Sequence, residues 1–248
     1  MTSTAFSPVG HLTAIHLYPV KSMRGHAIAS SAIDWAGIVG DRRWAWVKRN
    51  DHSLFPWLTA RNAPSLLRYV PQFASPADPL NSPVVVTTPE GNSMPIDDPA
   101  LHAELEELAG EPLHLLHLGA GTFDSMALSL MTTSALHNLQ ALIGTSLDPV
   151  RFRPNLVIET ADVGDFPEDG WIGGALVFGA GVDAPQLRIV RPIPRCMIIN
   201  LDPETTKQQP AVLRTVARER RNMAGVYGIP EALGLLAVGT PVFFIPAV

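Results

Sequence analysis

The sequence of 248 residues contains a single cysteine, Cys196. One cysteine excludes a disulfide within the chain, and it excludes iron–sulfur or zinc sites built from several cysteines of this chain. Sequences without disulfides are typical of reducing compartments, so we expect a cytoplasmic protein. If the thiol does chemistry, it must work with other residue types or with a bound group.

The chain also lacks an excess of positive charge. It has 18 Lys and Arg residues against 23 Asp and Glu residues, which gives a formal net charge of −5. Nucleic-acid binding calls for a basic field, so we expect no nucleic-acid partner. Any anion that this protein binds must therefore be held by a local cluster of basic side chains.

No apolar run is long enough to suggest a membrane span. The most apolar stretch, residues 233–248, is interrupted by two glycines and two prolines. This pattern is typical of a buried strand region. The first eleven residues lack the basic start and the apolar core of a secretion signal. We therefore expect no association with a membrane.

Proline and glycine are abundant, with 23 and 19 residues, and they favour short strands joined by turns. Alternating apolar residues and short strand-like runs predict strands at residues 12–18, 28–33, 43–47, 57–60, 66–73, 84–88, 155–159, 175–178, 187–193, 197–201 and 241–245. Capping residues and apolar spacing predict helices at residues 100–109, between Thr132 and Gly144, and at residues 210–221. The predicted fold is mostly β with a few helices (α+β), in two modules joined around residues 95–120.

The surroundings of Cys196 favour a functional thiol without requiring one. Arg195 is adjacent and Arg191 lies five residues earlier, so positive charge can stabilise a thiolate. Pro192 and Pro194 stiffen the approach to the cysteine. A thiolate is also a soft metal ligand. The alternative is a buried packing residue, which is the commonest role of a free cysteine.

Three basic segments have the composition of anion-binding sites. Residues 18–25 end a predicted strand at a proline and continue with Lys21, Ser22 and a glycine. Residues 41–43 and 151–155 each carry two arginines, whose planar groups can hold a phosphate through two hydrogen bonds. Solvated turns and surface ion pairs are the alternatives, since exposed Lys and Arg are the norm.

Acidic residues gather in one later turn. Asp165, Glu168 and Asp169 lie around the glycine turn of residues 166–171. A pair of carboxylates can act as general acid and base, although no histidine is close in sequence to assist it. We name these three as candidates for proton handling. The eight histidines show no metal-binding spacing of the H-E-x-x-H kind.

Taken together, these segments resemble a known family. Eight motifs occur in its order: YPVKS at 18–22, GDR at 40–42, TAR at 59–61, RFRPN at 151–155, FPEDGW at 166–171, RC at 195–196, LDPET at 201–205 and VGTPV at 238–242. The order is similar to that of MOSC-domain proteins with a MOSC N-terminal β-barrel module. That group includes the mitochondrial amidoxime-reducing component and its bacterial counterparts. The resemblance covers about residues 10–245.

The resemblance implies a fold and a cofactor. It implies a MOSC N-terminal β-barrel module at residues 1–98, packed on a β-barrel MOSC domain at residues 99–248, with a molybdenum cofactor (molybdopterin) between them. Cys196 would be the protein ligand of molybdenum. The other residues implied to bind the cofactor are Lys21, Ser22, Arg42, Arg153 and Asn155, together with Asp124 and Ser125 in a less closely matching loop.

The resemblance also implies an activity. The expected function is a molybdenum-dependent oxidoreductase that reduces N-hydroxylated compounds such as amidoximes, hydroxylamines and N-hydroxylated bases. No cysteine follows Cys196, so the electrons are expected to come from a separate iron–sulfur, flavin or haem protein. Two alternatives remain open. One is a sulfur carrier with a persulfide on the same cysteine, and the other is a protein that binds or stores the cofactor without catalysis.

Overall fold

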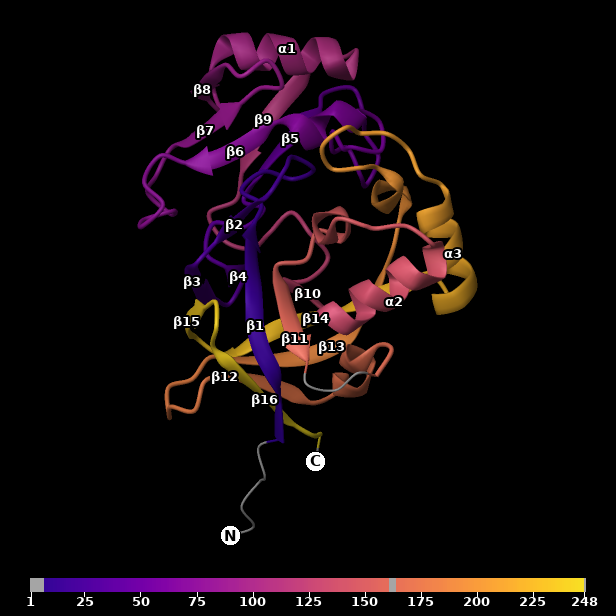
Figure 1. The fold of residues 1–248 in the computed structure, drawn as a ribbon. Helices are drawn as coiled ribbons and strands as arrows, with labels where there is room; N and C mark the ends of the chain where they lie inside the picture. The colour runs from indigo at the N-terminus through magenta and orange to yellow at the C-terminus, as the bar shows by residue number, and fades with distance from the viewer. Residues whose placement is uncertain (1–6, 161–163, 248) are drawn as a thin grey trace.

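β1 closes a seven-stranded barrel that forms the lower half of the molecule in Figure 1. The computed structural model describes residues 7–160 and 164–247. The strand order around the barrel is β11-β10-β14-β13-β12-β16-β1, and β1 pairs antiparallel with β11 to complete the ring. The barrel strands are β1 (Ser7–Leu17), β10 (Leu128–Thr132), β11 (Leu156–Thr160), β12 (Ala175–Phe178), β13 (Gln186–Pro194), β14 (Met223–Ala232) and β16 (Pro241–Ile245).

The upper half is built from smaller sheets (Figure 1). β5 (Trp44–Lys48) pairs with β9 (Leu113–His117), and β6 (Val70–Phe73), β7 (Val84–Thr87) and β8 (Ser93–Pro95) form a meander. A further sheet, next to the barrel, joins β15 (Gly234–Ala237), β3 (Ser30–Asp34) and β4 (Gly37–Ile38), while β2 (His26–Ile28) extends the barrel sheet beside β1.

The three α-helices in the described ranges begin and end at residues suited to those positions. Asp98 accepts from Ala100 N to cap α1 (Pro99–Ala109), and Thr132 accepts from Ala135 N to cap α2 (Thr133–Ile143). Both helices end at a left-handed glycine. α3 (Ala211–Arg220) ends instead at two left-handed residues, Arg221 (φ 50°) and Asn222 (φ 66°). The prediction of these helices is confirmed to within a residue or two.

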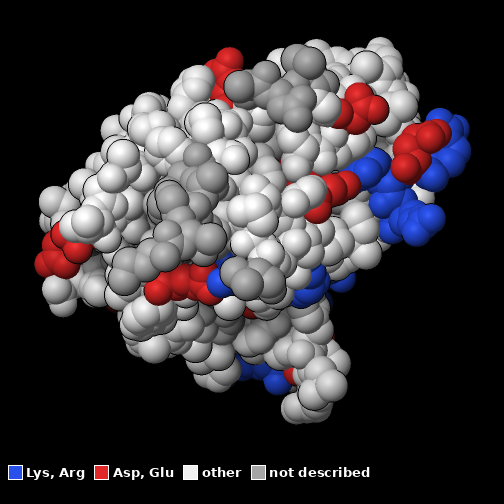
Figure 2. All heavy atoms as spheres, turned by 90° about the horizontal axis from the view of Figure 1, so that it is seen from below, with Lys and Arg blue, Asp and Glu red and all other residues white. Residues whose placement is uncertain are grey.

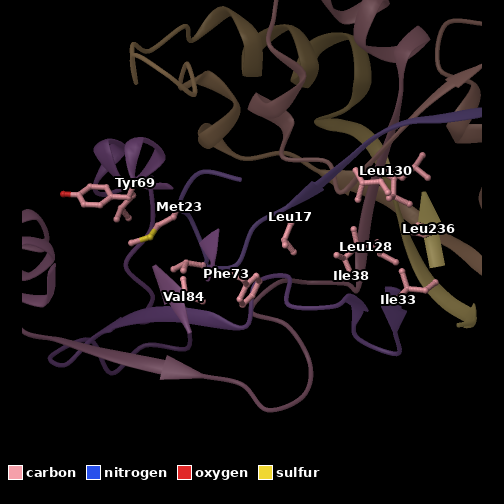
Figure 3. Packing of buried hydrophobic residues seen from close by; sticks show 14 of the residues in the cluster. Leu17, Met23, Ile33, Ile38, Tyr69, Phe73, Val84, Leu128, Leu130 and Leu236 are labelled. Atoms are coloured by element: carbon pink, nitrogen blue, oxygen red, sulfur yellow. The ribbon is translucent and has the colours of Figure 1, made fainter. Parts of the chain in front are cut away.

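One hydrophobic core runs through both halves. Figure 3 shows Tyr69, Phe73 and Val84 of the upper half, with Leu128 and Leu130 of the barrel to the right of them, and all five belong to one buried cluster. Strand pairing also crosses the predicted boundary at residue 98, because β1 belongs to the barrel and β9 pairs with β5. The fold class, mostly β with a few helices and a closed barrel, is confirmed. The division into residues 1–98 and 99–248 stays a prediction.

Four predicted strands are wrong in detail, and one of them, residues 28–33, divides between the end of β2 and β3 in a different sheet. Residues 197–201 form the 3₁₀ helix η4 (Met197–Asn200), because the buried Arg151 donates to the carbonyls of Ile199 and Asn200 and satisfies them without a neighbouring strand. Residues 66–73 begin within η1 (Pro64–Arg68) before β6 starts. Residues 57–60 pair only through an isolated bridge of Trp57 with Val47.

The described residues contain no helix that is long and apolar enough to cross a membrane. Figure 2 shows the face seen from below, where acidic and basic side chains are scattered among uncharged ones. Basic side chains gather at the right edge, the side on which α3 lies in Figure 1. Charge on this face is therefore mixed, which agrees with the small net charge of the chain.

Candidate functional site

A cavity of about 490 Å³ is lined by residues from both halves of the molecule. The turn after β1, the loops after β4, β5 and β9, the 3₁₀ helix η2 (Pro149–Phe152) and the segment after β13 all contribute to its wall. The lining residues used below are Lys21, Ser22, Arg42, Phe55, Trp57, Arg61, Phe123, Asp124, Ser125, Ser129, Arg151, Phe152, Arg153, Arg195, Cys196 and Tyr227. Chain segments separated by more than 150 residues thus meet in one space.

The described wall of the cavity is strongly basic. It contains six of the 18 Lys and Arg residues of the chain and one carboxylate, Asp124. The chain as a whole has a formal charge of −5. Positive charge concentrated in a hollow of a net acidic protein indicates a local anion site, as expected from the composition.

Arg42 lies at this wall but is largely occupied by the protein itself. Its guanidinium pairs with the buried Asp41, pairs with Asp124 at 3.0 Å and donates to Asn155 Oδ1 at 3.0 Å. Burial alone would lower the pKa of Arg42, but the two carboxylates raise it above its ordinary value. Arg42 therefore organises the wall from behind, with few donors left for a ligand.

Asp124 forms an ion pair with Arg42 and also lies within the electrostatic influence of Lys21. Burial would raise the pKa of its carboxyl group, but Arg42 and then Lys21 lower it below the ordinary value. The Asp124 side chain also accepts from the backbone N–H of Ser125 at 2.8 Å. The carboxylate is thus charged and fixed in orientation, and the loop of residues 122–125 is fastened to the cavity through it.

Lys21 presents its charge toward the cavity. Its Nζ donates to the carbonyl of Phe123 at 2.6 Å and lies 5.6 Å from the ring centre of Phe55. Burial lowers the pKa of Lys21, and Asp124 only partly offsets this. Ser22 follows in a left-handed conformation (φ 66°), so the chain turns there and the buried serine reaches the same wall.

Arg153 follows η2 in a left-handed conformation (φ 52°). Its Nη1 donates to the carbonyl of Met23 at 2.7 Å, and its guanidinium lies 4.3 Å from the ring centre of Tyr18. Burial and the nearby Arg42 lower the pKa of Arg153 to about 10, so it remains a cation at neutral pH.

Asn155 is fully buried and is not part of the cavity wall. Its Oδ1 accepts from Arg42, from Ser129 N at 3.1 Å and from Ser129 Oγ at 2.9 Å, while its Nδ2 donates to the carbonyl of His16 at 3.2 Å. The predicted ligand Asn155 therefore supports Arg42 and joins β10 to β1.

Cys196 is half-buried and lies on the cavity wall immediately before η4. The guanidinium of the preceding residue, Arg195, donates to the carbonyls of Phe152 and Ala224 at 2.7 Å each. Burial lowers the pKa of Arg195 to about 10. In the described part of the chain, no carboxylate oxygen lies within 4.0 Å of the side-chain nitrogens of Lys21, Arg153 or Arg195.

The three acidic residues named for proton handling do not line the cavity. Glu168, in η3 (Pro167–Trp171), is fully buried and accepts from Thr132 Oγ1 at 2.6 Å. Asp169 pairs with Arg220, and Asp165 lies exposed on the surface. Their role in proton handling stays a prediction that this geometry does not support, because none of the three side chains reaches the cavity.

Sequence reasoning missed several wall residues. Tyr227 lies on β14, whose glycines and proline hid the strand from the sequence pattern, and its side chain lines the cavity. Burial, then Asp124, raises the pKa of Tyr227, so its phenol remains protonated at neutral pH. Phe55 and Trp57 belong to a loop predicted partly as strand. Their aromatic character was visible, but nothing in the local pattern indicated a cavity.

Comparisons with known proteins agree with this architecture. The sequence matches the MOSC N-terminal beta barrel domain at residues 9–109 and the MOSC domain at residues 115–243. Mitochondrial amidoxime reducing component 2 of Homo sapiens and that of Macaca fascicularis are each 29% identical to the chain over 133 residues. The match covers 48% of this chain but only 37% of the length of those relatives.

A solved structure is similar over nearly the whole length. The YuaD protein from Bacillus subtilis superposes with a TM-score of 0.51 at 13% identity, over 97% of this chain and 98% of that one. At this identity the likeness shows the fold alone. The two domain matches confirm the resemblance read from the motifs, and the chain belongs to the MOSC domain family, with a MOSC N-terminal beta barrel domain preceding the MOSC domain.

Proposed function

We propose that the cavity binds a molybdenum cofactor of the molybdopterin type, and that the chain uses it to reduce N-hydroxylated compounds. The observation that carries this proposal is the meeting of the only thiol, Cys196, with the carboxylate-free cations Lys21, Arg153 and Arg195 on one wall. MOSC domains are associated with the molybdenum cofactor. The mammalian relatives are named for amidoxime reduction.

The residues of the wall fit such a group. A phosphorylated pterin needs cations that are not already in an ion pair with a protein carboxylate, and within the described chain Lys21 and Arg153 form none. A molybdenum ion accepts a soft thiolate, which Cys196 can supply. Ser22 and Ser125 add hydroxyl groups at the same wall. Arg42 and Asn155 would hold the wall in shape from behind rather than grip the phosphate directly.

When bound, the cofactor supplies the two-electron chemistry that the side chains lack. The chain would bind and orient it and tune it through Cys196. Reduction of an N–O bond to N–H and water consumes two electrons and two protons. Tyr227 holds a proton on its phenol oxygen at the cavity wall and is the side chain best placed to pass one on. The electrons would come from a separate iron–sulfur, flavin or haem protein in the cytoplasm.

The test is to purify the protein from a host that makes the cofactor and to measure molybdenum and pterin per chain. The same measurement on Cys196→Ala and Lys21→Met separates the metal ligand from the anion contact. We expect stoichiometric molybdenum in the wild type, loss of molybdenum in Cys196→Ala, and reduction of benzamidoxime with an artificial electron donor.

Two other outcomes would replace this proposal. Cyanide-labile sulfur on Cys196 without molybdenum would indicate the sulfur carrier. Bound molybdenum without reduction of benzamidoxime would indicate a binding or storage protein.

A further inference from the structure

Asn222 connects the C-terminal end of α3 to the residue that precedes the cysteine. Its side-chain Nδ2 donates to the carbonyl of Arg195 at 2.7 Å, and its own carbonyl accepts from Arg195 N at 2.9 Å. Its backbone N–H donates to the carbonyl of Val216 in α3 at 3.1 Å. Both backbone groups of Arg195 are therefore held by one residue.

The end of β13 has a particular need for such a contact. Pro192 and Pro194 have no N–H to donate to β14, and the pairing of the two strands shifts register between them. The regular ladder therefore weakens just before Arg195. The side-chain amide of Asn222 supplies a donor at the place where the backbone ladder stops.

The conformation of Asn222 suits this task. Its φ of 66° lies in the left-handed region, which asparagine adopts more readily than most residues. Arg221 is left-handed as well (φ 50°), so the two residues turn the chain sharply from α3 into β14. This turn brings the Asn222 side chain back onto the neighbouring strand.

The side chain of Arg195 is fastened separately. Its guanidinium donates to carbonyls of Phe152 and Ala224, which belong to η2 and β14. Residue 195 is thus fixed at both its side chain and its backbone, and Cys196 follows directly on the cavity wall.

We propose that Asn222 is a positioning residue that sets the orientation and accessibility of the Cys196 thiol by clamping the backbone of Arg195. The importance of this clamp rests on the proposed function of Cys196, although the clamp itself can be tested without the cofactor.

The test uses the fact that Cys196 is the only thiol, so alkylation of the full chain reports on this residue alone. The chain is produced in a host that cannot make molybdopterin, and its alkylation by iodoacetamide is timed well below the melting temperature. Asn222→Gly keeps the left-handed backbone and the carbonyl acceptor but removes the amide. We expect alkylation at least about fivefold faster, the change that corresponds to one lost hydrogen bond of ordinary strength.

Two further variants make the result specific. Asn222→Asp keeps the size of the side chain but cannot donate, so it should react at least as fast as Asn222→Gly. Arg221→Gly relieves the same kind of backbone strain next door without touching Arg195, and its alkylation rate should stay within about twofold of the wild type. The melting temperatures of all three variants are measured as well, and values well above the assay temperature would exclude general unfolding as the cause of faster alkylation.

An alkylation rate in Asn222→Gly that equals or falls below that of the wild type would overturn the clamp, as would equal acceleration in Arg221→Gly. Both outcomes are independent of molybdenum content. Failure of the clamp and failure of the proposed function are therefore told apart.

Discussion

The cations on the cavity wall fall into two groups that differ in how their charges are satisfied. Arg42, which lines the cavity, is paired with Asp41 and Asp124, and Asn155 accepts from it. On the same wall, the side chains of Lys21 and Arg153 donate only to backbone carbonyls. In the described part of the chain, their nitrogens have no carboxylate oxygen within 4.0 Å. All three cations are largely removed from water, yet only Arg42 is neutralised by carboxylates of the protein.

The difference separates two roles that look alike in the sequence. A buried cation with a full set of partners contributes to folding, and its removal leaves an uncompensated charge. A desolvated cation without a carboxylate partner costs stability until an anion binds, which is the signature of a ligand site. Neutralising Arg42 should therefore mainly lower the stability of the fold. Neutralising Lys21 or Arg153 should mainly weaken anion binding.

The largest effect is expected from Arg42→Met. The side chain of Asp41 is only 1% exposed, so its charge would remain buried with the Tyr18 N–H as a partner but without a cation. We expect the free energy of unfolding to fall by about 3–5 kcal/mol, measured by urea denaturation. Arg43→Met is the matched control, because its partner Asp34 is one-third exposed and water can replace the lost cation. Equal losses of unfolding free energy in Arg42→Met and Arg43→Met would contradict the idea that a fully buried partner makes the loss of the cation costly.

Glu168 extends the comparison to a buried carboxylate with no cation bonded to it. Burial raises its pKa to about 7, from an ordinary value of 4.5. Between these pH values the unfolded chain releases a proton that the folded chain retains. The contribution of Glu168 to the free energy of unfolding is therefore fully present below about pH 4.5, and it is lost as the pH rises to about 7.

The expected size of this loss is about 3 kcal/mol. Glu168→Gln should remove the pH dependence and be more stable than the wild type above pH 7, in urea denaturation at several pH values. Asp165→Asn, an exposed change nearby, should leave the profile unaltered. A wild-type stability that does not fall between pH 4.5 and 7, relative to Glu168→Gln, would refute the buried-acid assignment.

Lys21→Met tests the wall itself. Stability should change by no more than about 1 kcal/mol, because the lost cation has no carboxylate partner and its burial was costly. Binding of inorganic phosphate, followed by calorimetry, should weaken about tenfold or more, since one charge-assisted hydrogen bond is removed. Lys48→Met, which breaks a pair with Glu111 outside the cavity, should leave phosphate binding intact. If Lys21→Met lost as much stability as Arg42→Met, the distinction between the two kinds of cation would be wrong.

The smallest effect on the fold is expected from Tyr227→Phe. This change removes one hydroxyl from the cavity wall, which should cost about 1 kcal/mol or less. Molybdenum content should be retained, while turnover of benzamidoxime should fall if the phenol passes a proton to the substrate. Unchanged turnover would remove Tyr227 from the proposed chemistry and leave it as part of the wall.

Much of the fold could be predicted from local pattern. Asp98 and Gly110 delimit α1 as expected, and the apolar runs at residues 175–178 and 241–245 form strands with the predicted bounds. These features depend on interactions within a few residues along the chain. The apolar run of residues 197–201 misled because its carbonyls bond to Arg151, nearly 50 residues away in sequence.

The site was predictable in composition but not in arrangement. The sequence by itself determined that Cys196 is the only thiol, that basic residues cluster in three segments, and that the motifs follow the order of the MOSC family. Only the tertiary structure decided that Arg42 is paired, that Asn155 lies behind the wall and that Glu168 lies away from the cavity. The reason is physical, because the state of a charge depends on the partners that folding brings to it. Arg42 and Asn155 meet across 113 positions of sequence, a separation over which no local pattern carries information.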